Sequence, residues 1–176
     1  ELALRFSMPI VLFGEGGGGR PGDDSTGPAV AFDTHTFTQF SKLSGAVPMI
    51  GVNHGRCFAG NTALLACCDV IIATEDSTIA MGGPAMIEGG GLGIYTPEEV
   101  GPMSFQVPNG VVDILVENEA EAVRVAKQYL SYFQGSISTW EAADQRKLRH
   151  IVPENRLRLY DMREIISTIA DRELSL

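Results

Sequence analysis

Short apolar runs that stop at glycine, asparagine or a polar turn recur along the chain. Residues 8–13 read Met-Pro-Ile-Val-Leu-Phe before a glycine, and residues 70–73 read Val-Ile-Ile-Ala. Short continuous apolar runs are typical of strands that are buried on both faces of a sheet. The pattern predicts strands at residues 8–13, 48–53, 70–73, 78–81 and 111–116.

Elsewhere, apolar side chains return every three or four residues, which is the spacing of one helix face. Phe37, Phe40 and Leu43 form such a stripe, and Asn118 followed by Glu121 is typical of a capped helix start. Strands that alternate with helices predict an α/β core with a mainly parallel sheet. We expect helices at residues 34–46, 59–68, 118–133 and 160–170, loops at 14–22, 54–58 and 82–97 with one helical turn at 85–88, and a polar connector at 135–155.

Composition narrows the classes of function. The 176 residues suffice for one folded domain, and 13 Lys+Arg against 22 Asp+Glu give a net charge of −9. That charge argues against non-specific binding to nucleic acid or anionic membranes. No apolar run approaches the roughly 20 residues of a membrane span, and no signal peptide is recognisable. The three cysteines fit neither a disulfide framework nor zinc-ribbon spacing, so we expect a cytoplasmic protein with no metal.

Two glycine-containing loops follow predicted strands and are the candidates for chemistry. In the first, residues 14–22, the glycines formally match G-x-G-x-x-G, but Arg20 and the Pro-Gly-Asp-Asp that follows cannot open a helix there. No Walker-type Gly-Lys-Ser/Thr follows either. What remains is a run of backbone N–H groups that can converge on a ligand; the alternative is a flexible surface loop.

The second loop, residues 55–61, joins a predicted strand to a helix that starts near Ala59. Free N–H groups at a helix start attract negative charge, and the small residues Ala59 and Gly60 leave room for a carbonyl oxygen. This arrangement suits an oxyanion hole. An ordinary tight turn between strand and helix is the alternative.

Motifs along almost the whole chain resemble the carboxyltransferase subunits of biotin-dependent acyl-CoA carboxylases. Residues 55–69, Gly-Arg-Cys-Phe-Ala-Gly-Asn-Thr-Ala-Leu-Leu-Ala-Cys-Cys-Asp, are similar to that family's G-x-C-x-G-G-A…D stretch, and Gly-Gly-Gly-Arg at 17–20 to its S-G-G-A-R loop. Further matches, in the same order, lie at residues 83–87, 95–101, 109–113, 130–133 and 153–171.

The resemblance implies a ClpP/crotonase-like fold that the family repeats in two homologous domains. Residues 1–135 would be the N-terminal domain, and residues 136–176 a linker and helix leading to a second domain. The family's N-terminal domain mainly holds the acyl-CoA, while biotin enters through the second domain of a neighbouring subunit. The implied partners are acyl-CoA, biotin on its carboxyl carrier protein, a biotin carboxylase component and further copies in a homo-oligomer. The chain alone is expected to be inactive.

The resemblance also assigns site residues. Backbone N–H groups of Ala59 and Gly60 would form one oxyanion hole, and Gly18 and Gly19 would contact the other charge that develops, on the biotin ureido oxygen. The residues expected to contact the substrate beside these donors are Gly17, Arg20, Cys57, Phe58 and Asn61. The chain departs from the family pattern at three positions: Ala59 replaces a glycine, Asn61 an alanine and Arg56 a proline. The larger side chain of Asn61 is expected to narrow the pocket.

Several alternatives stay open. Arg20 can bind an anionic group of the substrate or pair with the aspartates that follow it, and His54 can accept a proton or serve the structure. A crotonase-type hydratase or isomerase without biotin would need a pair of carboxylates near the Ala59–Gly60 turn, for which the candidates are Glu88, Glu98 and Glu99. A non-catalytic fragment that only binds CoA is the third reading.

Overall fold

The computed structural model describes residues 1–18, 35–136 and 138–171. They form two compact units, Glu1–Phe133 and Gln134–Leu176. The first unit contains the sheets. The role expected for residues 136–176, a linker into a further domain, stays a prediction.

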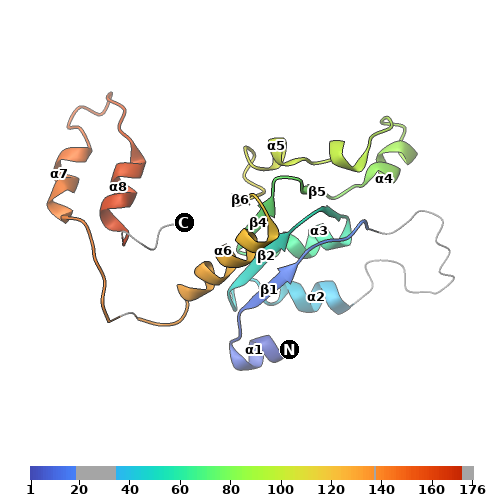
Figure 1. Cartoon of the computed structure of the whole chain (residues 1–176), viewed down its shortest axis with the longest axis horizontal. Helices are drawn as coiled ribbons and strands as arrows, with labels where there is room; N and C mark the ends of the chain where they lie inside the picture. The colour runs from blue at the N-terminus through green and yellow to red at the C-terminus, as the bar shows by residue number, and fades with distance from the viewer. Residues whose placement is uncertain (19–34, 137, 172–176) are drawn as a thin grey trace. The chain divides into compact units, whose positions relative to one another are not determined.

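Four parallel strands form the main sheet, in the order β1-β2-β4-β6 (Figure 1). The strands are β1 Ile10–Phe13, β2 Met49–Asn53, β4 Val70–Thr74 and β6 Ile114–Val116. The predicted α/β class and parallel sheet are confirmed. The run at residues 111–116 pairs only from Ile114, because the N–H groups of Val111 and Val112 both donate to the carbonyl of Gln106 and close a turn there.

A second sheet pairs β3 Arg56–Phe58 with β5 Thr78–Ala80, again in parallel. The expected loop at residues 54–58 is therefore wrong for its last three residues. Their partner strand lies about twenty residues further along the chain, and no local pattern signals such a pairing. An isolated bridge between Gly16 and Cys57 extends this sheet towards the loop after β1.

The helices of the first unit are short apart from one. They are α1 Leu2–Phe6, α2 His35–Ser41, α3 Gly60–Leu65, α4 Pro84–Gly89, α5 Met103–Gln106 and α6 Glu119–Ser131, with a 3-10 turn η1 Pro97–Glu99. Helix α6 begins as predicted, since the Asn118 side chain accepts the N–H of Glu121. The predicted helix at 34–46 ends at Ser41, and the chain turns through Gly45, whose φ is 75°. In the described part of the chain, no helix is long and apolar enough to cross a membrane.

The second unit holds a 3-10 turn η2 Gln145–Lys147 and the helices α7 Leu148–Ile151 and α8 Met162–Ile169. The predicted helix at 160–170 is confirmed, and the Asp161 side chain caps it. The expected connector at 135–155 is wrong where η2 and α7 form. Contacts to α8 support these turns, including a hydrogen bond from the Gln145 amide to the carbonyl of Thr168.

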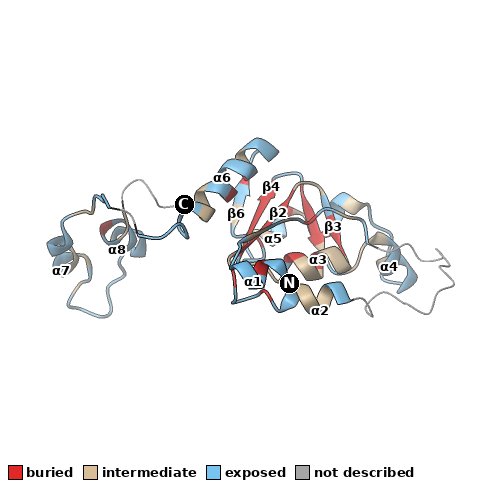
Figure 2. Cartoon of the chain, turned by 90° about the horizontal axis from the view of Figure 1, so that it is seen from below, coloured by how far each residue is buried: buried red, intermediate tan, exposed pale blue. Residues whose placement is uncertain are grey.

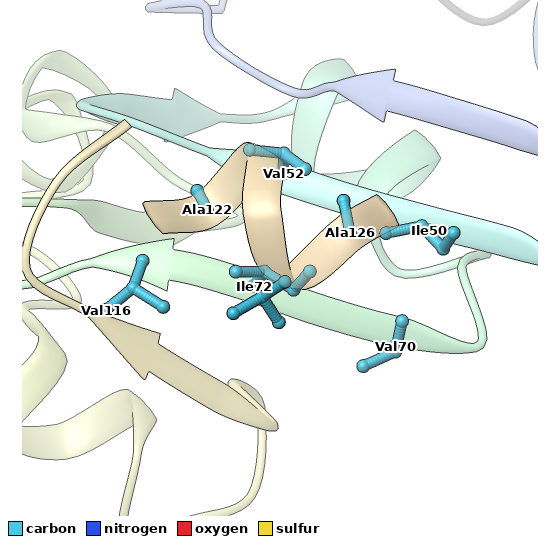
Figure 3. Packing of buried hydrophobic residues seen from close by; sticks show 8 residues of the cluster. Ile50, Val52, Val70, Ile72, Val116, Ala122 and Ala126 are labelled. Carbon is cyan, nitrogen blue, oxygen red and sulfur yellow. The ribbon is translucent and has the colours of Figure 1, made fainter. Parts of the chain in front are cut away.

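Alternate side chains of the central strands face two apolar layers. Helix α6 covers one face, where Ala122, Val125 and Ala126 pack against Ile50, Val52, Val70, Ile72 and Val116 (Figure 3). On the other face, Ile71 and Ala73 of β4 pack with Leu65 of α3. Figure 2 shows β2 and β4 as a buried layer between more exposed helices. Because both faces are covered, the loops at the carboxyl ends of the strands hold the accessible backbone.

Candidate functional site

The turn between β3 and α3 presents backbone N–H groups that have no acceptor among the described residues, and that of Gly60 is the first of them. Ala59 is the N-cap of α3 and Gly60 its first residue. The N–H of Ala59 donates to the carbonyl of Ala80 at 3.2 Å, whereas the structure pairs the N–H of Gly60 with no acceptor among the described residues. Of the two predicted donors, Gly60 is therefore the one available to a ligand, and Ala59 fixes the turn.

Ala59 has a backbone conformation that favours glycine. Its φ is 55° and its ψ is −123°. For a residue with a Cβ, such dihedral angles cost of order 1–3 kcal/mol. The hydrogen bond to Ala80 and the packing around β3 hold the strained conformation in place.

Replacing Ala59 with glycine is expected to stabilise the protein by about 1 kcal/mol, because relief of this strain outweighs the extra chain entropy of glycine. Urea unfolding followed by circular dichroism measures the change. Ala63→Gly inside α3 is the matched control and should instead destabilise by about 1 kcal/mol. If both variants lose stability equally, Ala59 is not strained.

The loop after β1 is fastened against this turn. The N–H of Gly16 donates to the carbonyl of Arg56 at 2.7 Å, and the N–H of Phe58 donates to the carbonyl of Gly16 at 2.9 Å. A Cβ on Gly18 would lie 3.0 Å from the Cβ of Ala59. The Asn61 side chain occupies the space that a Cβ on Gly16 would need. The two loops predicted from the sequence thus lie side by side.

A cavity of about 830 Å³ opens between the two loops. Five predicted site residues line it: Gly17, Gly18, Ala59, Gly60 and Asn61. Its other lining residues are Gly16, Phe37, Met81, Gly82 and Met86, which the sequence reading did not place in the site. The sequence placed Phe37 in an apolar helix stripe, and that stripe predicted a position in the core and not in the site. Gly19 and Arg20, also predicted for the site, lie outside the described residues.

Cys57 and Phe58 lie behind the cavity instead of lining it. Their exposed fractions are 0% and 2%. Burial raises the pKa of the Cys57 thiol, while a contact with the Thr62 hydroxyl works in the opposite direction. Phe58 packs beside Gly83, where α4 begins. The two side chains support the turn, and the high pKa leaves Cys57 a poor nucleophile.

The buried Cys57 and the half-buried Cys68 are expected to resist alkylation at pH 8. Burial, with smaller contributions from Cys67 and Asp69, raises the pKa of Cys68 to about 12, and burial also raises the pKa of Cys57. Since the thiolate is the reactive form, iodoacetamide should label these two thiols at least about tenfold more slowly in the folded protein than in urea. Mass spectrometry of the peptides measures both rates. Fast labelling of folded Cys57 would show that the thiol is accessible and ionised.

His54 belongs to a separate polar cluster. Its Nδ1 lies 2.7 Å from a carboxylate oxygen of Glu119 and 3.5 Å from one of Glu15. It does not line the cavity. These contacts connect the end of β2 with the loop after β1 and with the start of α6, which favours the structural reading of His54. No group of three or more metal-ligating side chains occurs among the described residues.

The acids that a hydratase would need are engaged elsewhere or do not line the cavity. Glu98 pairs with Arg56, and the carboxylate of Glu99 accepts hydrogen bonds from the N–H and hydroxyl of Thr96. Glu88 is exposed and does not line the cavity. Of the described lining residues, only Asn61 has a polar side chain. The cavity thus offers backbone donors and an apolar wall, an arrangement that can stabilise charge on a carbonyl oxygen.

Known proteins share this architecture. The chain resembles the structure of a single-chain, multi-domain long-chain acyl-CoA carboxylase, with a TM-score of 0.83 and 57% identity over 98% of this chain and 17% of that one. It also resembles the transcarboxylase 12S structure with methylmalonyl-CoA and methylmalonic acid bound, with a TM-score of 0.76 and 28% identity over 97% of this chain and 35% of that one. The predicted crotonase-like fold is confirmed by these neighbours.

Sequence relatives agree with the structural ones. The chain is 30% identical to the methylmalonyl-CoA carboxyltransferase 12S subunit of Propionibacterium freudenreichii subsp. shermanii, over 97% of this chain and 34% of that protein. It is 26% identical to the uncharacterized carboxylase YngE of Bacillus subtilis, over 98% of this chain and 36% of that protein. The chain therefore spans about a third of the length of these relatives. Residues 1–175 match the carboxyl transferase domain, and the chain belongs to that family.

Proposed function

We propose that this chain forms the acyl-CoA-binding side of a carboxyltransferase active site, where a carboxyl group moves between carboxybiotin and an acyl-CoA. The observation that carries the proposal is the N–H of Gly60, which has no acceptor among the described residues and belongs to a cavity lined by glycines and apolar side chains. Membership of the carboxyl transferase domain family supports it.

In this proposal the thioester oxygen of the acyl-CoA accepts a hydrogen bond from Gly60. When the α-carbon loses its proton, negative charge develops on that oxygen, and one backbone donor in such a position is worth roughly 2.7–4 kcal/mol where it has been measured. The strained turn at Ala59 holds the donor in a fixed direction. Cleavage of the N–carboxyl bond of carboxybiotin would release the carboxyl group as CO₂ and leave the ureido nitrogen to take the α-proton. The α-carbon of the resulting enolate would then form the new C–C bond to CO₂. Gly17 and Gly18 line the same cavity as Gly60 and have no Cβ, so a second planar group can approach the backbone there.

The partners follow from the same chemistry. Biotin would arrive on a carboxyl carrier protein after a biotin carboxylase component has loaded it, and relatives described as biotin-dependent carboxylase subunits support this dependence. The transcarboxylase 12S neighbour is described as a hexamer, which supports a homo-oligomer here. The 57% identical neighbour is named for long-chain acyl-CoA, so we include long acyl chains in the proposed substrate class.

Transfer of a labelled carboxyl group tests the proposal. The complete natural protein that contains these residues is incubated with carboxybiotin that carries the label, together with an acyl-CoA. We expect the label to appear in the acyl-CoA. Hydration of an enoyl-CoA without any transfer from carboxybiotin would contradict the proposal and favour the hydratase reading.

A further inference from the structure

Three apolar side chains line the cavity, and we call them its apolar wall. Phe37 belongs to α2, Met81 follows β5, and Met86 lies on α4. Met81 and Met86 are 56% and 62% exposed. Covering a water-exposed methionine side chain with an apolar group lowers the free energy of the system. The flexibility of methionine also lets it fit apolar chains of differing shape.

Phe37 lies against the residue that carries the proposed backbone donor. A Cβ on Gly60 would lie 2.8 Å from Cζ of Phe37, so the ring packs close to the Cα of Gly60, whose N–H we assign to the thioester oxygen. Further along, a Cβ on Gly82 would lie 3.8 Å from the Cβ of Met86. Because Gly82 has no side chain, space remains between its backbone and the Met86 side chain.

Chemistry decides which part of an acyl-CoA fits this wall. The pantetheine arm has two amide groups that lose hydrogen bonds to water when they are buried, and each needs a new partner. Phe37, Met81 and Met86 offer no hydrogen-bonding group that could serve. An acyl chain carries only methylene and methyl groups beyond the thioester and needs none.

We infer that Phe37, Met81 and Met86 hold the acyl chain of the substrate and set its length preference. The inference rests on the proposed function, since it takes the thioester to lie at Gly60. It commits the site to acyl groups longer than acetyl or propionyl.

Substitution of Met86 tests this inference in the complete natural protein that contains these residues. Met86→Ala keeps a good helix former on α4 and removes most of the apolar side chain. We expect binding of decanoyl-CoA to weaken about tenfold and binding of acetyl-CoA to change less than about twofold, because only the longer chain reaches Met86. Dissociation constants are measured by calorimetry for acetyl-, butyryl-, octanoyl- and decanoyl-CoA, and for CoA itself.

Leu92→Ala is the matched control. Leu92 follows α4 and is 74% exposed, but it does not line the cavity. This variant should keep the affinity for every chain length.

Two outcomes would overturn the inference, and they differ in what they leave standing. If Met86→Ala weakens the binding of all the acyl-CoA esters and of CoA equally, or weakens none, the apolar wall does not bind the acyl chain, although the proposed function survives. If the unaltered protein binds no acyl-CoA of any length, the proposed function fails as well.

Discussion

Replacing Gly60 with valine is expected to reduce carboxyl transfer by a factor of about 10²–10³, the effect of losing one oxyanion donor. Even the Cβ would lie 2.8 Å from Cζ of Phe37, and the two methyl groups would fill the space where the thioester oxygen should approach the N–H. The measurement is the rate of carboxyl transfer from carboxybiotin in the complete protein. The ring of Phe37 can shift, so the fold should persist, which circular dichroism and thermal melting check.

Gly89→Ala provides the control for this experiment. Gly89 is the last residue of α4, and a Cβ there would meet nothing within 4 Å. The control should keep full activity. If a folded Gly60→Val variant also keeps full activity, this turn does not form the oxyanion hole.

The largest loss of stability is expected from Gly101→Ala. The φ of Gly101 is 66°, and an added Cβ would fall well inside contact distance of the carbonyl oxygen of Ile79. Gly101 also accepts a hydrogen bond from the N–H of Ile79 at 2.9 Å, so neither backbone can move without disturbing β5. Backbone strain and this collision together should cost about 4 kcal/mol or more of the free energy of unfolding.

Gly110→Ala separates the two causes. Gly110 has a similar φ of 79°, but a Cβ there would meet nothing within 4 Å. It should cost only the conformational penalty of about 1–2 kcal/mol. Urea unfolding of both variants measures the difference. Equal losses would mean that the close approach at Gly101 does not exist in solution.

Much of the main sheet could be predicted because each buried strand is a continuous apolar run. The apolar run at residues 70–73 predicts β4 without further information, because a strand that is covered on both faces has apolar side chains at every position. Strand β3 could not be predicted in this way, because its three residues depend on a distant partner in β5. The helices α1 and α5 were not foreseen either; each is too short for a helical period to show.

The candidate site was predictable where it consists of backbone. Glycine and alanine after a strand indicated the turn at Ala59 and Gly60 and the loop at Gly17 and Gly18, because small residues mark places where a ligand can reach N–H groups. The apolar wall was not predictable. Met86 lies in the helical turn predicted at residues 85–88, which α4 confirms, but only the folded chain brings it to the same cavity as Gly60.

The central claim is that the thioester of an acyl-CoA binds with its oxygen at the N–H of Gly60. Infrared difference spectroscopy with ¹³C at the thioester carbonyl measures this contact directly. A hydrogen bond that polarises the carbonyl lowers its stretching frequency, so we predict a lower frequency for the bound thioester than for the same compound in water. A bound thioester whose carbonyl frequency equals the value in water would contradict the claim.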